Sequence, residues 1–209
     1  MDRLLEVSRR DGIVVLHVPS PVGFDALARL TWEIGDACRT VAEEEEPAAA
    51  VFVTARGPAF GVVSPTSAAD CDAARETWSA ATAAIACLTA PTVAVIQADA
   101  IGPAWELALA CARRPAATTA RLGSPEIRWG RIPSAGGTQR LTRIAGQAIA
   151  RQLLLLGELL TADEAFQLGL VHQVAPPDGL DGLQQDLLNT LKGNAPIALA
   201  YVKEAVRQG

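Results

Sequence analysis

The stretch LGSPEIRWGRIPSAGGTQRL, residues 122–141, places a glutamate shortly before a glycine-rich turn that opens a helix. Glu126 follows a Gly-Ser-Pro tripeptide, a position typical of a first-turn helix glutamate, where the helix dipole favours negative charge. The turn Ser134–Thr138 could bind phosphate through the exposed amides of a helix start, but it lacks the Gly-Lys-Ser/Thr ending of a P-loop. Taken alone, the stretch predicts a strand–turn–helix junction that carries one acidic side chain.

A second glutamate, Glu106, lies 20 residues earlier, near the start of a helix whose other residues are almost all apolar. A carboxylate held among apolar neighbours has a raised pKa, which suits it to exchange protons near neutrality. Gly102 allows close backbone approach, Pro103 suits the first helical position, and the exposed amides there could stabilise an oxyanion. The two glutamates could then meet and share one water or one substrate carbon. The alternative is a structural glutamate paired with one of three nearby arginines, Arg113, Arg114 and Arg128.

Apolar runs alternate with helical periodicity along most of the chain. We expect buried strands over residues 13–18, 49–54, 92–96, 118–122 and 170–174. We expect helices over residues 24–41 and 69–88, around Glu106, twice between residue 134 and Gly157, after a capping box at Thr161 and Glu164, and twice more before the C-terminus. This alternation favours an α/β fold with largely parallel pairing in one domain.

The composition excludes several function classes. The chain has 209 residues and a net charge of −5, so it has no basic surface of the kind that nucleic acid requires. Its four cysteines have neither CxxC spacing nor paired histidines, so we expect no metal site, no disulfide framework and no cofactor. Each cysteine instead fits a small buried thiol in a helical run: Cys38, Cys71, Cys87 and Cys111.

Two segments bear on location. Residues 1–6 show no apolar stretch with a small-residue cleavage site, so we expect a cytoplasmic protein. Thr77–Ala98 carries no charge over 22 residues, which is long enough to span a bilayer. Pro91 divides this segment, which is rich in Ala and Thr rather than Leu. A buried helix followed by a buried strand is therefore expected, with no membrane partner.

Residues 122–141 closely resemble the signature of the enoyl-CoA hydratase/isomerase (crotonase) family. The resemblance is strongest from about Pro91 to Val174 and continues in these segments: 91–95, 106–111, 155–157, 161–171 and 196–206. It implies an α/β spiral of ββα turns with C-terminal helices. It also implies one crotonase-like domain over residues 1–209, with a spiral core to about 175 and a helical segment over about 176–209 that is shorter than in the family. A homotrimer or hexamer that takes acyl-CoA thioesters is expected.

The resemblance also implies roles for individual residues. Glu106 would hold and deprotonate the water that adds to Cβ, and Glu126 would supply the proton to Cα. Because many isomerases of the family lack one of these glutamates, retaining both favours an enoyl-CoA hydratase of fatty acid metabolism. The alternatives are a catalytically weak or inactive acyl-CoA-binding member and an enoyl-CoA isomerase.

In the family the thioester oxygen lies between two backbone amides. The matching positions here are Ser64 and Pro103, but proline has no N–H, so Ala104 is the substitute donor. Trp105 is bulkier than the residue usual at its position and could fill the acyl pocket. The expected substrate-binding residues are Ala59, Phe60, Val62, Gly102, Trp105 and Pro133.

Overall fold

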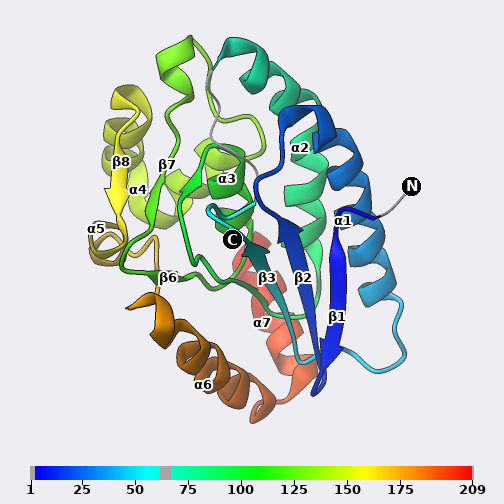
Figure 1. Ribbon diagram of the computed structural model, residues 1–209. Coiled ribbons are helices and arrows are strands. Elements are labelled where there is room, and N and C mark those ends of the chain that lie inside the picture. Colours follow the sequence, from blue (N-terminus) through cyan, green and yellow to red (C-terminus); the bar gives the residue numbers. More distant parts are fainter. Residues whose placement is uncertain (1–2, 62–66, 209) are drawn as a thin grey trace.

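A four-stranded sheet forms the first half of the fold in the computed structural model, which describes residues 3–61 and 67–208 (Figure 1). The strand order is β1-β2-β3-β4; β1 pairs antiparallel with β2, and the other two pairs are parallel. The bounds of the strands are β1 (Glu6–Arg10), β2 (Ile13–Pro19), β3 (Ala50–Arg56) and β4 (Thr92–Ala94).

The helices connect and cover the strands. Their bounds are η1 (Phe24–Ala26), α1 (Leu27–Ala42), α2 (Ala68–Cys87), α3 (Pro103–Ala110), η2 (Glu126–Trp129), α4 (Gly137–Leu156), α5 (Ala162–Gln167), η3 (Pro177–Gly179), α6 (Leu180–Lys192) and α7 (Pro196–Gln208). The capping box of Thr161 and Glu164 at α5 is confirmed. The two helices expected before Gly157 are the two halves of α4, which meet at a kink where Gly146 has φ 78°.

Both faces of the sheet are covered, which explains why its strands read as continuous apolar runs. Successive side chains of β3 point to opposite faces. Val51 and Val53 join the main core, to which α1 and α2 contribute, whereas Ala50 and Phe52 join a second cluster with Leu180 of α6. The sheet is therefore enclosed between α1 and α2 on one side and α6 on the other.

A first parallel ladder continues beyond β4. Two bridges, Val93 to Arg113 and Ile96 to Ala116, connect it to β6 (Pro115–Ala117). In turn, β6 pairs in parallel with β9 (Gln173–Ala175).

A second ladder repeats this arrangement beside the first. Ala59, which follows β3, bridges Asp99 in parallel, β5 pairs in parallel with β7, and β7 pairs antiparallel with β8. The bounds are β5 (Ala100–Ile101), β7 (Arg121–Gly123) and β8 (Leu159–Thr161). Successive turns of the chain thus place one strand in each ladder before a helix, which is the expected spiral of ββα turns.

Three expectations from the sequence are wrong in detail. The single strand at residues 118–122 is instead two short strands, β6 and β7, in different ladders and separated by a turn at Thr118 and Thr119. The last strand begins at Gln173 rather than at residue 170 because Leu170 and Val171 pack into the main core and their amides donate to the carbonyl of Ala165. Among the cysteines, Cys87 is exposed because it ends α2.

Candidate active site

The two parallel strands β5 and β7 bring both glutamates to the same place. Ile101 pairs with Gly123, and the amide of Gly102 donates to the carbonyl of Gly123 at 2.8 Å. Because the carboxyl ends of parallel strands meet at one edge, the segments that follow them begin side by side. Glu106 lies in α3, directly after β5, and Glu126 begins η2, directly after β7.

Glu106 is buried in a helix whose eight residues are all buried. Gly102 precedes the helix as its N-cap with φ of 63° and ψ of −124°, which favour glycine, and Pro103 is the first helical residue, as expected. The Glu106 Oε1 atom accepts hydrogen bonds from the amides of Ala135 at 2.7 Å and Gly137 at 2.8 Å. A Cβ at Gly137 would lie 2.8 Å from that same oxygen, so glycine is what permits the approach.

Glu126 has a different environment. It is only 4% exposed, and within the part of the chain that the structure describes its Oε2 atom has no hydrogen-bond partner. Burial and, to a smaller extent, repulsion from Glu106 raise the pKa of Glu126 to about 7, against the lowering effect of a hydrogen bond from its own backbone amide. Burial also raises the pKa of Glu106 to about 7, against the lowering effect of the two amides and of Arg140.

The pair is chemically asymmetric. Two amide donors favour the ionised form of Glu106, whereas the unpartnered oxygen of Glu126 favours the protonated form. Mutual repulsion opposes double ionisation, so the pair titrates as a coupled unit. The surroundings of the two carboxyl groups thus favour different protonation states near neutral pH, an arrangement that suits general acid–base chemistry.

Raised carboxyl pKa values have a consequence for stability. Glu126 binds its proton more tightly in the folded chain than at its ordinary pKa of 4.5, so stability falls as pH rises from 4.5 to about 7. Glutamine does not titrate, so Glu126→Gln should be more stable than the original chain above about pH 7, on the order of 1–3 kcal/mol. Below pH 4.5 the two proteins should differ little in stability. Thermal melts of both proteins at about pH 5 and about pH 8 measure this. The same stability difference at both pH values would contradict the raised pKa.

The expected oxyanion donors are placed only in part. Pro103 offers no amide, and its carbonyl accepts from the indole N–H of Trp78 at 2.7 Å. Ala104 is buried at the second position of α3, where an amide has no partner within the helix. Ser64, the other predicted donor, lies outside the described residues, as does Val62.

The remaining predicted substrate-binding residues lie in two groups. Ala59 and Phe60 follow β3, and the amide of Phe60 donates to the carbonyl of Asp99, just before β5, at 2.8 Å. Trp105, beside Glu106, is 2% exposed and belongs to the main core. Pro133 lies near Glu106, because a Cβ added at Gly137 would be 2.9 Å from Pro133 Cβ and 2.8 Å from Glu106 Oε1. Their contact with substrate stays a prediction.

Comparison with known proteins gives the family. The family model described as enoyl-CoA hydratase/isomerase matches residues 11–209. This chain belongs to the crotonase family. A probable enoyl-CoA hydratase of Mycobacterium tuberculosis is 32% identical over 98% of this chain and 80% of its own length. A short-chain-enoyl-CoA hydratase of Clostridium acetobutylicum is 38% identical over 122 residues, 58% of this chain.

The fold of the family is confirmed as well. The crystal structure of an enoyl-CoA hydratase from Bacillus anthracis superposes with a TM-score of 0.85 at 27% identity, and covers 98% of this chain and 82% of that one. The match to the Clostridium acetobutylicum hydratase covers 47% of that protein, so this chain spans about half the length of some curated relatives that it matches.

The alternative that Glu106 is a structural residue paired with a nearby arginine is wrong. Among the ion pairs of the described residues, none joins Glu106 to Arg113, Arg114 or Arg128. Arg114 donates instead to the carbonyls of Leu170 and Cys111, and Arg128 donates to that of Gly157. The true partners of Glu106, two amides of the glycine-rich turn, lie about 30 residues away in the chain. The two adjacent glycines of that turn were the available signal, because glycine allows close backbone approach.

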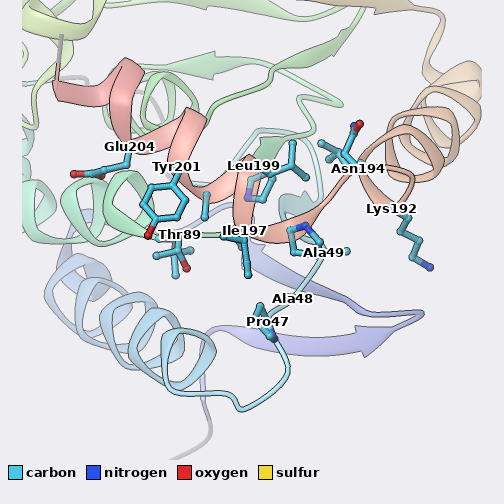
Figure 2. A pocket seen from close by; sticks show the side chains of 16 residues that line it. Pro47, Ala48, Ala49, Thr89, Lys192, Asn194, Ile197, Leu199, Tyr201 and Glu204 are labelled. Carbon is cyan, nitrogen blue, oxygen red and sulfur yellow. The ribbon is translucent and has the colours of Figure 1, made fainter.

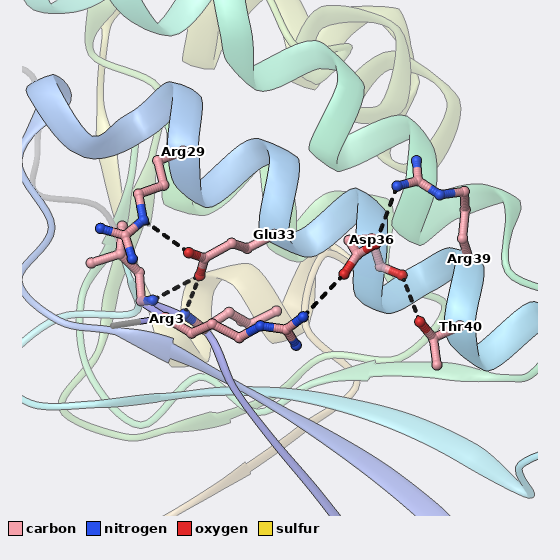
Figure 3. A network of polar contacts seen from close by, with 8 residues as sticks. Arg3, Arg29, Glu33, Asp36, Arg39 and Thr40 are labelled. Carbon is pink, nitrogen blue, oxygen red and sulfur yellow. Dashed lines mark hydrogen bonds and ion pairs between the residues drawn. The ribbon is translucent and has the colours of Figure 1, made fainter. Parts of the chain in front are cut away.

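A third buried glutamate shows what a purely structural role looks like in this chain. Glu33 of α1 accepts through Oε2 from the amides of Leu4 and Leu5, both at 2.7 Å, and through Oε1 from Arg29 at 3.0 Å (Figure 3). Nearby, Asp36 pairs with Arg3 across the same helix face. Both oxygens of Glu33 are satisfied, and they fix the N-terminal segment to α1. Glu126 differs in this respect, because its Oε2 atom has no partner among the residues that the structure describes.

A cavity of about 530 Å³ lies elsewhere (Figure 2). Its walls come from the segment before β3, the segment between α2 and β4, the end of α6, and α7, which contributes Ile197, Tyr201 and Glu204. It therefore opens at the amino ends of β3 and β4, whereas the acid pair follows the carboxyl ends of β5 and β7. The cavity contains none of the predicted site residues.

Two further searches concern the described residues alone. Within residues 3–61 and 67–208, no group of three or more His, Cys, Asp or Glu side chains is arranged to hold a metal ion. Within the same residues, no helix has the length and apolar character needed to cross a bilayer. The uncharged Thr77–Ala98 segment instead forms most of the second half of α2 and then β4.

Proposed function

We propose that this chain hydrates 2-enoyl-CoA thioesters. The observation that carries the proposal is the asymmetric pair: Glu106 held by two amides, and Glu126 buried within its electrostatic range, with one oxygen that has no partner among the described residues. The crotonase family provides the substrate class, and relatives named as enoyl-CoA hydratases support the reaction type.

In the proposed reaction, the Glu106 carboxylate holds a water molecule and accepts one of its protons as the water oxygen bonds to Cβ. The electron pair of the 2,3 double bond moves to the thioester oxygen and forms an enolate. Glu126 then donates its proton to Cα, and the carbonyl re-forms. The net result is one water added across the double bond, and proton exchange between the pair and solvent restores the starting state.

The enolate oxygen needs amide donors. We propose the amide of Ala104 for one of them, because it lies at the start of α3 with no partner within the helix. We propose the amide of Ser64 for the other. Pre-oriented donors of this kind are typically worth about 3–4 kcal/mol each to the transition state.

A second candidate function is acyl-CoA binding with weak or no turnover. Pro103 favours it, since the family's usual amide donor is missing at that position. Buried Trp105 favours it too, because an indole at this position of α3 leaves less space for an acyl chain than a smaller side chain would. An enoyl-CoA isomerase is the third candidate, for which one carboxyl group suffices.

Assembly as a homotrimer or hexamer is also proposed. Large apolar side chains are exposed at the end of α4 and on α7, which supports association with further protein surface. The residues are Leu155, Leu156, Ile197, Tyr201, Val202 and Val206.

A panel of enoyl-CoA esters of increasing chain length, assayed for binding and turnover, tests the function. We expect crotonyl-CoA or a longer member to lose the ultraviolet absorbance of its conjugated double bond as water adds. Lys192→Ala, in the separate cavity of Figure 2, serves as a control that should leave turnover unchanged. If the protein binds the esters tightly but turns none of them over, the binding function replaces hydration. If it binds none of the esters, both proposed functions are wrong.

A further inference from the structure

Two side chains outside the acid pair converge on one backbone carbonyl. Thr82 of α2 donates through Oγ1 to the carbonyl oxygen of Ala135 at 2.8 Å, and Arg140 of α4 donates through Nη1 to the same oxygen at 2.6 Å. The amide of Ala135 donates to Glu106 at 2.7 Å. Ala135 is therefore held on both sides, by the two donors at its carbonyl and by the Glu106 carboxylate at its amide.

The turn that carries Ala135 has no strand or helix to hold it, because α4 begins only at Gly137. Thr82 is 1% exposed and Ala135 is 2% exposed, so water cannot substitute freely for a lost donor. At Gly136, φ is 89° and an added Cβ would lie 2.6 Å from Arg140 Nη1. The absence of a side chain there lets the Arg140 guanidinium fold back over the turn.

The groups that act electrostatically on the two glutamates come from several elements. Glu126 of η2 and Glu106 repel each other, and the Cys71 thiol of α2 lies close enough to Glu126 for that charge to raise the thiol pKa. Arg140 is the cation that acts on Glu106, and it lowers the pKa of that carboxyl. The Thr82 hydroxyl is also 3.0 Å from the carbonyl of Ser79 in its own helix, but Ala135 is the nearer acceptor.

We propose that Thr82 and Arg140 are positioning residues for Glu106: by fixing the carbonyl of Ala135, they hold the amides that aim the Glu106 carboxylate. They do not touch the reacting atoms. The kinetic consequence rests on the proposed hydration, whereas the effect on the Glu106 carboxyl does not.

Thr82→Val, which keeps the shape but removes the hydroxyl donor, is the first test. We expect kcat for crotonyl-CoA hydration to fall about 10-fold with KM within about twofold, and the acid limb of the pH profile to move to higher pH. Thr82→Ser should restore most of the rate. The matched control is Thr77→Val on the same helix. The Thr77 hydroxyl donates within its own helix, to the carbonyl of Ala73 at 2.9 Å, so its loss should change neither kcat nor the profile.

The second test does not need turnover. The Glu106 carboxyl is followed by carbon-13 NMR in glutamate-labelled protein and assigned with Glu106→Gln. Its titration midpoint should rise in Thr82→Val and in Arg140→Met, but not in Arg151→Met, which removes an exposed arginine of the same helix. If the original chain hydrates no ester, the proposed function fails and this titration still decides the positioning role.

An unchanged Glu106 titration and an unchanged kcat in Thr82→Val and Arg140→Met would overturn the inference. Equal losses in Thr82→Val and Thr82→Ser, with a matching fall in melting temperature, would also overturn it, because they indicate structural damage alone. Should Thr82→Val not fold, Arg140→Lys decides: it keeps the positive charge but loses the guanidinium fork, and the Glu106 midpoint should still rise.

Discussion

Replacing Glu126 with glutamine should lower kcat for enoyl-CoA hydration by about 10³-fold, because the amide has no acidic proton to give to Cα. Binding of a saturated acyl-CoA should change little, since the side chain keeps its size in a site that is only 4% exposed. Turnover is followed by the loss of enoyl absorbance, and binding by calorimetry. The loss should therefore appear in kcat and leave ligand affinity within about threefold.

The control for this variant is Glu76→Gln, the same substitution on the exposed face of α2, which should leave both quantities unchanged. Hydration by Glu126→Gln at the original rate would show that another group supplies the proton. A parallel loss of rate and ligand affinity would indicate instead that Glu126 holds the ligand. Either outcome removes the acid role that the unpartnered Oε2 atom suggests.

The meeting of the two glutamates could be predicted from the sequence because each follows a recognisable local signal. Gly102 and Pro103 mark the start of α3, and a Gly-Ser-Pro tripeptide precedes Glu126. The glycines and prolines thus predicted that both glutamates follow strand ends, and the family resemblance predicted that these strand ends lie close together. Alternating apolar runs and caps such as that of Thr161 predicted the α/β class with parallel pairing, whereas the spiral of ββα turns was predicted only through the family resemblance.

What could not be predicted depends on contacts between distant segments. The hydrogen bond between Glu106 and Ala135 forms only in the tertiary structure, and hydrophobic periodicity in the sequence does not predict which backbone amide donates to a buried carboxylate. β1 (Glu6–Arg10) was missed because it is a polar edge strand without an apolar run. The Asp11-Gly12 turn was the available signal, since both residues have positive φ and that pair is typical of a tight hairpin.

Replacing Gly137 with alanine should lower kcat by about 10²-fold, although the residue lies 31 positions from Glu106 in the chain. The added Cβ would lie 2.8 Å from Glu106 Oε1 and 2.9 Å from Pro133 Cβ, both closer than real contacts allow. The turn and the carboxylate must therefore separate, which breaks the 2.8 Å hydrogen bond from the Gly137 amide. Overpacking of this kind also costs about 1–3 kcal/mol of stability.

Gly35→Ala is the matched control, because Gly35 is helical and an added Cβ there meets no atom within 4 Å. It should leave activity unchanged and stabilise the fold slightly, by about 0.4–1 kcal/mol. Melting curves separate a folding defect from a displaced carboxylate: Gly137→Ala should remain folded at the assay temperature while its kcat is reduced. A folded Gly137→Ala variant with full activity would show that catalysis does not depend on the carboxylate position fixed by this turn, which would count against Glu106 as the base.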